Sequence, residues 1–501
     1  MLGDIEVNMS EFSEKLTSYI VRSGYSVYQL AKEASLDRTT LQKTAKGQRL
    51  PSLDYIKDIC RYIKISSRQE EELITLYQIE KQGWETVEAW HEIDACLNDI
   101  RAVYEKKTDT PLFAIHMDEK SLENFNKEIQ RSYTTESECI KAIMCVIEQE
   151  FMEQNTPEIF MDVSWASGVA LEQCALTTYK EQSESKKFVC HQLVNLKNTE
   201  QAREGILENV KMLRQILPYA LAPKNEYDVR YMYVNETHED QKSHLWGHYI
   251  ITHQHVLLCS NKKNHLVVIS NKQIADVYRE EVMEMMKEYR PLLDFQGFSG
   301  EGIRQYRQMI NYYDTHLTYE PFPCVALMCP VELRKMILED PKLKEYAAAF
   351  FETPKVPSDH YINIFGMKGI KEFIKTGHLP GMFDSYFVAE TMEMRKSMLI
   401  SFYDQLVAAP RRLYLINEEE FEEGTSFGIE LCGRNHVVFS SNAPEYPFGY
   451  IFIDESGICD IFSSFFDNFV QSKYVYSIEE TIEKYEEIVR NCFEELSDKE
   501  Q

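Results

Sequence analysis

The chain has 501 residues, of which 44 % are hydrophobic and 12 % aromatic, so it can form several cores and is not expected to be disordered. Its formal net charge of −27 excludes a uniformly basic surface. Its 12 cysteines form no CxxC pair, which argues against a zinc ribbon or a disulfide framework. No apolar run is long enough to span a membrane, and the first residues do not begin a secretory signal, so we predict a cytoplasmic protein.

The charge is divided unevenly along the chain. From Lys15 to Arg68 there are 11 Lys and Arg against four acidic residues, a balance of +7, which leaves −34 for the remainder. Binding to phosphates depends on the local basic surface, because counterions are released where the protein touches the nucleic acid. The acidic remainder should repel DNA elsewhere. This division predicts a small DNA-binding region attached to a large acidic body.

The segment from Ser26 to Gly47 predicts two short helices joined by a tight turn. Ser26 and Asp37 are good N-cap residues, and Gly47 suits a left-handed C-cap. The apolar residues of both helices share one face, which leaves the second helix with a polar outer surface. Further helices are predicted over about residues 11–23 and 52–63 and after residue 66, each with apolar residues at helical spacing.

Five short helices in this order resemble the XRE-type Cro/repressor family of lambda-repressor-like domains. The resemblance covers residues 8–80 and rests on the run LAKEASLDRTTLQKTAKG and the following GQRLPS. It implies an all-α helix-turn-helix domain that binds double-stranded DNA. A helical bundle whose charges are only solvated is the alternative.

The resemblance also implies which residues touch DNA. The residues implied at base edges, with their neighbours on the recognition helix, are Arg38, Thr39, Thr40, Gln42 and Lys43. Those implied for phosphate and flanking contacts are Val27, Tyr28 and Gln29. Many members carry Gln or Ser where this chain has Arg38, so the recognised DNA sequence does not follow from the family.

Residues 81–108 predict one further helix with an apolar stripe. It can be a linker, a dimerisation helix or part of the core of the body. The run KKTDTP at 106–111 is the clearest linker signal, so we place a domain boundary near it.

Beyond this boundary, strand-like and helical patterns alternate and predict an α/β body of two lobes, residues 109–296 and 321–501, with a connection over 297–320. Two stretches recur: His255–Asn261 resembles His436–Asn442, and Ile274–Tyr278 resembles Ile458–Phe462. The offsets are 181 and 184 residues. We therefore predict a duplicated α/β unit whose copies pack as pseudo-repeated lobes. Chance similarity of short hydrophobic strands is the alternative.

The Ser-Asn pairs at 260–261 and 441–442 resemble an element of the phospholipase D superfamily, which has two α/β lobes. The nearest counterpart of that family's HxK motif is His248-Tyr249-Ile250, which lacks the lysine, and the second lobe has no upstream histidine. The resemblance implies a fold that is kept for binding and has lost catalysis.

Six of the 13 histidines lie between residues 238 and 265. Imidazoles at such spacings can bind zinc, but they span a loop and a hairpin, so we predict structural or solvated histidines and no metal. No phosphate-binding loop, nucleophile elbow or dinucleotide motif is present, so we predict no catalytic residues and no cofactor.

These observations favour a sequence-specific transcriptional regulator that binds DNA as a homodimer. Its body would sense a small-molecule effector or set the oligomeric state. Two alternatives remain: a phosphodiesterase directed to nucleic acid, and an antitoxin-like regulator controlled by a protein partner.

Overall fold

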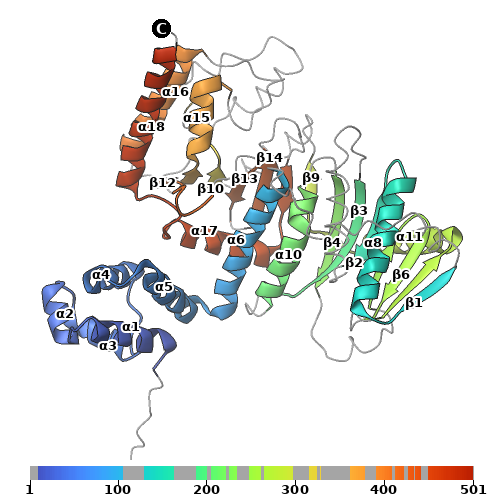
Figure 1. The fold of residues 1–501 in the computed structure, drawn as a ribbon, viewed down its shortest axis with the longest axis horizontal. Helices are drawn as coiled ribbons and strands as arrows, with labels where there is room; N and C mark the ends of the chain where they lie inside the picture. The colour runs from blue at the N-terminus through green and yellow to red at the C-terminus, as the bar shows by residue number, and fades with distance from the viewer. Residues whose placement is uncertain are drawn as a thin grey trace, which may run out of the picture. The chain divides into compact units, whose positions relative to one another are not determined.

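The computed structural model describes most of the chain (Figure 1). The described residues are 9–104, 129–162, 188–199, 205–221, 225–233, 247–260, 265–296, 315–323, 328, 361–378, 391–408, 412–422, 427–433, 435–441 and 450–499. They form two compact units, which are described separately: residues 1–91 with 203–207, and residues 92–202 with 208–501. None of the described helices is long and apolar enough to cross a membrane.

The first unit is a bundle of five short helices and the start of a sixth. The five are α1 (Glu11–Arg22), α2 (Val27–Glu33), α3 (Arg38–Ala45), α4 (Leu53–Ile63) and α5 (Ser67–Gln82). Each begins after a polar residue whose side-chain oxygen accepts a hydrogen bond from a backbone N–H of the first turn: Ser10, Ser26, Asp37, Ser52 and Ser66. The N-terminal region is thus helical, as predicted, because its caps and its apolar spacing agree.

Side chains from all five helices form the core of the bundle. The buried members of this cluster are Phe12, Leu16, Tyr19, Ile20, Leu30, Ala31, Leu41, Ile56, Ile59, Cys60, Ile63, Leu73 and Tyr77. Two hydroxyls of α1 also bind the carboxyl end of α3: Ser13 donates to the carbonyl of Thr44 at 2.9 Å, and Thr17 donates to that of Ala45 at 3.0 Å. These bonds fix the carboxyl end of α3 against α1, and the carbonyl of Thr44 also accepts from the backbone N–H of Gly47 at 3.0 Å.

Helix α6 (Trp84–Tyr104) continues from the bundle. Its apolar stripe is buried within the chain: Val87, Ala89, Trp90, Ile93, Cys96, Leu97 and Ile100. Helix α10 (Ile206–Ala220) is joined to it by Arg214, whose guanidinium lies 2.7 Å from Asp99 and 2.9 Å from Glu92. Of the three predicted roles for this stripe, burial supports a core helix. The boundary predicted near residue 108 lies outside the described residues.

The second unit is a mixed α/β body with two sheets. Sheet A has the strand order β1-β7-β6-β5-β2-β3-β4-β8. Its strands are β1 (Gln130–Tyr133), β2 (Glu158–Asp162), β3 (Phe188–Leu196), β4 (Asn225–Tyr233), β5 (His248–Ile251), β6 (His255–Cys259), β7 (Leu266–Ser270) and β8 (Arg290–Pro291). Strands β2, β3 and β4 are parallel, and the other neighbours are antiparallel.

Sheet B has the order β12-β11-β10-β13-β14-β15-β9. Its strands are β9 (Asp294–Gln296), β10 (Thr315–Glu320), β11 (Ile362–Phe365), β12 (Arg412–Leu415), β13 (Phe427–Cys432), β14 (His436–Ser441) and β15 (Tyr450–Ile453). Here β10, β11 and β12 are parallel, and the remaining pairs are antiparallel. Strands β9 and β10 precede residue 321, so sheet B includes residues that come before the predicted start of the second lobe.

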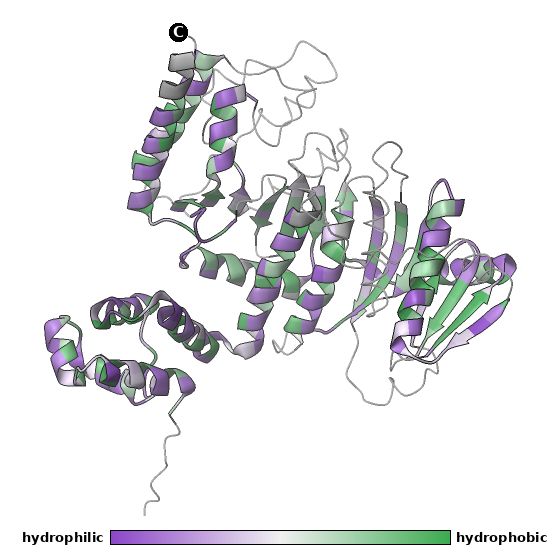
Figure 2. Cartoon of the chain, in the orientation of Figure 1, coloured by the Kyte–Doolittle hydropathy of each residue, from purple (hydrophilic) through white to green (hydrophobic). Residues whose placement is uncertain are grey.

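Helices accompany both sheets: α8 (Glu136–Glu153), α11 (Lys272–Met286), α15 (Met367–Thr376), α16 (Met392–Ala408), α17 (Ser456–Phe469) and α18 (Ile478–Lys499). Helix α11 packs on one face of sheet A through Ala275, Val282 and Met286. Alternate strand residues such as Ile159 and Met161 are also buried, so both faces of sheet A are covered. Figure 2 shows the matching pattern, with green strands and helices that are green on one side.

Candidate nucleic-acid interface

Helices α2 and α3 are joined by the short segment from Ala34 to Asp37. Ser35 has a positive φ of 54° in this turn, and the N–H of Leu36 donates to the carbonyl of Ala31 at 2.9 Å. This bond closes the end of α2 and redirects the chain. The turn therefore depends on a left-handed residue that is not glycine.

The start of α3 is held by Asp37. Its carboxylate accepts from the backbone N–H of Thr40 at 2.6 Å, and the hydrogen bonds with Thr40 lower the pKa of Asp37. The backbone carbonyl of Asp37 accepts from the hydroxyl of Tyr55 on α4 at 2.9 Å. The first turn of α3 is thus fixed both by its own cap and by a neighbouring helix.

The residues predicted on α3 lie on its outer side. Four of them, Arg38, Thr39, Gln42 and Lys43, are exposed, and Thr40 is half-buried. The opposite side of the helix is buried through Leu41, Thr44 and Ala45. The helix therefore presents polar and basic side chains together on one surface.

The residues predicted on α2 have three different environments. Val27 is half-buried and packs against the core of the bundle, so only its backbone can reach a phosphate. The side chain of Gln29 accepts from the backbone N–H of Ser26 at 3.1 Å in a capping box. Tyr28, in contrast, has 55 % of its surface exposed.

Tyr28 and Arg38 are brought together by the turn. The guanidinium carbon of Arg38 lies 4.9 Å from the centre of the Tyr28 ring. This distance is typical of a cation–π contact. The first residue of α3 is therefore supported by an aromatic side chain at the start of α2.

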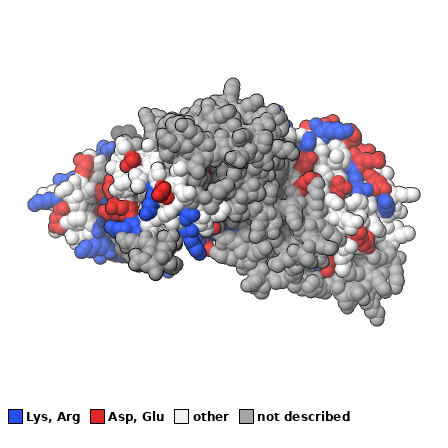
Figure 3. All heavy atoms as spheres, turned by 90° about the horizontal axis from the view of Figure 1, so that it is seen from above, with Lys and Arg blue, Asp and Glu red and all other residues white. Residues whose placement is uncertain are grey.

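Sequence reasoning missed a second arginine at this surface. Arg49 is exposed, and its Nη1 donates to the hydroxyl of Thr40 at 3.2 Å. It follows the C-cap of α3 in the run GQRLPS. Its positive charge and its position after α3 could have identified it from the sequence. Lys46, the exposed C-cap residue of α3, adds another positive charge. Figure 3 shows Lys and Arg side chains on the described surface, interspersed with Asp and Glu.

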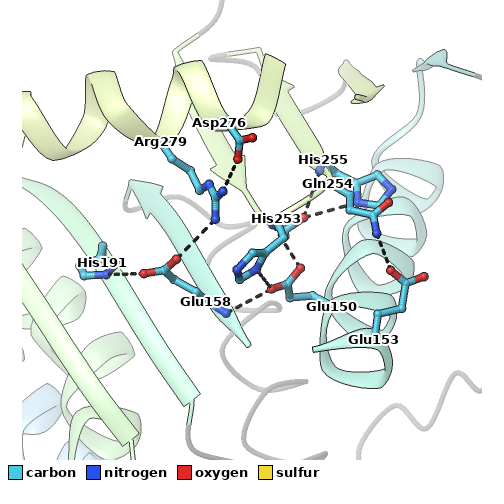
Figure 4. Close-up of polar contacts among 10 residues, drawn as sticks. Glu150, Glu153, Glu158, His191, His253, Gln254, His255, Asp276 and Arg279 are labelled. Atoms are coloured by element: carbon cyan, nitrogen blue, oxygen red, sulfur yellow. Dashed lines mark hydrogen bonds and ion pairs between the residues drawn. The ribbon is translucent and has the colours of Figure 1, made fainter. Parts of the chain in front are cut away.

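Two described histidines of the predicted cluster, His248 and His253, contact carboxylates on separate elements. In Figure 4, His253 faces Glu150 of α8. His248 lies 2.7 Å from Asp162 at the end of β2. His255 is buried, and burial lowers its pKa to about 4. No group of three or more metal-ligating side chains occurs within the described ranges. His238 and His244 lie outside those ranges.

A histidine that the sequence did not single out lies between two carboxylates. The Nε2 of His191 on β3 lies 3.2 Å from Glu158 on β2, and its Nδ1 lies 3.8 Å from Asp228 on β4. Burial alone lowers the pKa of His191, but the two carboxylates outweigh it and raise the pKa to about 9. Glu158 also contacts Arg279 of α11 at 3.5 Å (Figure 4). This network joins three parallel strands and a helix.

No protein-family model matches the chain, and no curated protein matches its sequence. Among solved structures, the chain is similar to TrmBL2, an archaeal chromatin protein whose structure is described as showing a novel mode of DNA binding. The identity is 10 %, the match covers 57 % of this chain and 95 % of TrmBL2, and the TM-score is 0.21.

Proposed function

We propose that this protein is a transcriptional regulator that binds specific DNA sites through α2 and α3, with the fold of an XRE-type helix-turn-helix. The observation that carries the proposal is the polar outer side of α3, where Arg38, Thr39, Gln42 and Lys43 are exposed together. A helix with such a surface fits the major groove, where side chains reach base edges.

The basic residues beside this surface support the same proposal. Lys43, Lys46 and Arg49 are exposed, whereas the acidic residues of the chain lie mostly outside residues 15–68. Contacts between such side chains and phosphates provide binding that depends on salt. The protein would then work in the cytoplasm, beside the DNA.

The proposal is tested by selecting binding sites from random DNA with the full-length chain. Affinity for the best site is then measured over a salt series. Arg38→Ala should reduce discrimination against the wrong base about tenfold or more. Lys46→Ala should instead reduce the slope of log affinity against log salt by about one, as expected for a phosphate contact. If no sequence is enriched and both variants bind like the parent, the proposal is wrong.

We propose that the acidic body arose by duplication. Seven described strands of sheet A have the same order and the same relative directions as the seven described strands of sheet B. In this comparison β1-β7-β6-β5-β2-β3-β4 corresponds to β9-β15-β14-β13-β10-β11-β12. The caps of the following helices also correspond, since Asn271 accepts from the N–H of Ile274 and Glu455 from that of Ile458. This agreement supports the repeat predicted at an offset of 184 residues.

The body would bind the effector and would bring two protomers together, which a small helix-turn-helix domain needs. One such domain has a small footprint, and dimers read two half-sites about one helical turn apart. We therefore propose a homodimer whose body binds a small-molecule effector and which acts by binding, without catalysis. Sedimentation with and without a 20- to 30-base-pair operator would measure the stoichiometry, and one protomer per full site would contradict the dimer.

One contact favours a second candidate, a phosphodiesterase related to the phospholipase D superfamily. His248 lies 2.7 Å from Asp162, and the half-buried carboxylate of Asp162 also accepts from the N–H of Tyr249 at 3.1 Å. An imidazole held by a carboxylate can act as a nucleophile or as a base. Release of nitrophenol from bis(p-nitrophenyl) phosphate, abolished in His248→Ala, would support this function. Equal release by both proteins would eliminate it.

A further inference from the structure

The start of α3 carries a planar cation that is already oriented in the absence of DNA. Arg38 is the first residue of α3 and is exposed, and its guanidinium carbon is 4.9 Å from the ring centre of Tyr28. Tyr28 lies one residue after the start of α2, so the two side chains meet across the turn. Contact with the ring covers part of the guanidinium and leaves its N–H edge available for other partners.

The surroundings of this pair fix the ring as well as the arginine. The turn between the helices is closed by the hydrogen bond from Leu36 to Ala31, and α2 begins with the capping box of Ser26 and Gln29. Tyr28 therefore lies on backbone that is fixed on both sides. An arginine held in this way loses less rotational freedom when it forms paired hydrogen bonds.

The chemistry of a fixed guanidinium edge identifies its DNA partner. Arginine donates two parallel hydrogen bonds to the O6 and N7 of guanine in the major groove, whereas adenine, with one acceptor and one donor, cannot accept both. A phosphate also accepts from arginine, but a phosphate contact carries no sequence information. An arginine at the first position of a helix that faces the groove is suited to a base edge.

We propose that Tyr28 is a positioning residue which holds Arg38 to read one guanine in each half-site. This inference rests on the proposed function and deepens it, since it assigns one base of the site and gives Tyr28 a different role from the phosphate contact first predicted. The ring is essential to this role and the hydroxyl is not, because the contact involves the face of the ring.

The test uses the full-length chain and its best selected DNA site, with each base pair of the half-site replaced in turn. The position that loses most discrimination in Arg38→Ala identifies the base pair read by Arg38, and a guanine is expected there. Arg38→Lys should also lose this discrimination while keeping its charge, because lysine lacks the planar fork. Tyr28→Ala should reduce discrimination at the same position about two- to fivefold, with an unchanged salt slope.

Tyr28→Phe and Lys46→Ala are the matched controls. Tyr28→Phe keeps the ring, so it should bind like the parent at every position. Lys46→Ala should weaken binding to all sites alike and change the salt slope if Lys46 contacts a phosphate. Circular dichroism of Tyr28→Ala verifies that the bundle is folded.

The possible results distinguish a failure of the role given to Tyr28 from a failure of the proposed function. If DNA binding is specific but Tyr28→Ala leaves the Arg38 position unchanged, or alters the salt slope alone, the inference fails while the proposed function stands. An adenine, thymine or cytosine at the Arg38 position overturns it as well. If the chain selects no DNA sequence at all, the proposed function fails first, and that result is visible before any variant is made.

Discussion

The hydroxyl of Tyr233, the last residue of β4, lies 2.7 Å from Oε1 of Glu455, the N-cap residue of α17. Glu455 is 1 % exposed and also accepts from the N–H groups of Gly457 and Ile458. One buried carboxylate thereby caps α17 and binds a strand of sheet A. The contact joins residues that are 222 positions apart in the sequence.

Removal of this hydroxyl should destabilise the body. Tyr233→Phe leaves the buried carboxylate of Glu455 with one donor fewer, which we expect to cost about 1–3 kcal/mol of unfolding free energy. Denaturant unfolding followed by circular dichroism measures this change. Tyr403→Phe is the matched control, because the contact of Tyr403 with Glu486 is long, at 3.4 Å, and exposed. Equal stability of both variants would contradict the role given to Glu455.

The hydrogen bond from Ser13 to α3 predicts that its removal lowers the stability of the helical unit. Ser13→Ala removes the donor from α1 to the carbonyl of Thr44, in a buried position, and should destabilise the bundle by about 1 kcal/mol. Because this carbonyl lies at the end of the helix that we propose to face DNA, the affinity for DNA should fall as the bundle loosens. Ser23→Ala, at the C-cap of α1, removes a partly buried hydroxyl that donates to the carbonyl of Ile20 three residues earlier, and should have a smaller effect.

The turn at Ser35 predicts an opposite response at two positions. Ser35 has a φ of 54°, and a serine there bears the strain of the left-handed region. Ser35→Gly should therefore leave the free energy of unfolding unchanged or raise it by up to about 1 kcal/mol. Gly24 has a φ of 81° with open space around it, so Gly24→Ala should lose about 1 kcal/mol through backbone strain alone. Thermal unfolding of the two variants provides the comparison. Destabilisation by Ser35→Gly would show that the hydroxyl, and not the backbone, determines the turn.

The network around His191 predicts that stability depends on pH. Its pKa is raised to about 9, above the ordinary value near 6.5, because Glu158 and Asp228 favour the charged imidazole. The interaction of the charged imidazole with the two carboxylates stabilises the folded chain fully below pH 6.5, and this contribution is lost as the pH rises through 9. His191→Gln should therefore show a smaller decline in stability between pH 6.5 and 9.5. Identical profiles of the two proteins would contradict the pairing.

Much of the helical unit could be predicted from the sequence, because its determinants are local. The caps Ser26 and Asp37 and the apolar spacing of Leu30 and Leu41 act within one or two turns, and the observed helices begin where those residues predict. The strand β6 follows from the sequence for a similar reason, since His255–Cys259 is a short apolar run. The exposed residues of α3 also follow from this spacing, because a helix that buries one side must expose the other.

Only the tertiary structure decided which residues meet across long separations. The sequence indicates neither that β9 and β10 join sheet B nor that His191 lies between Glu158 and Asp228, because strand pairing is set by the register of distant segments. The Tyr28–Arg38 contact needed the angle between two helices, which the turn at Ser35 determines. The local pattern thus specified which side chains of α3 are exposed. The folded chain specified which neighbours hold them, because those contacts depend on backbone directions that no short stretch of sequence contains.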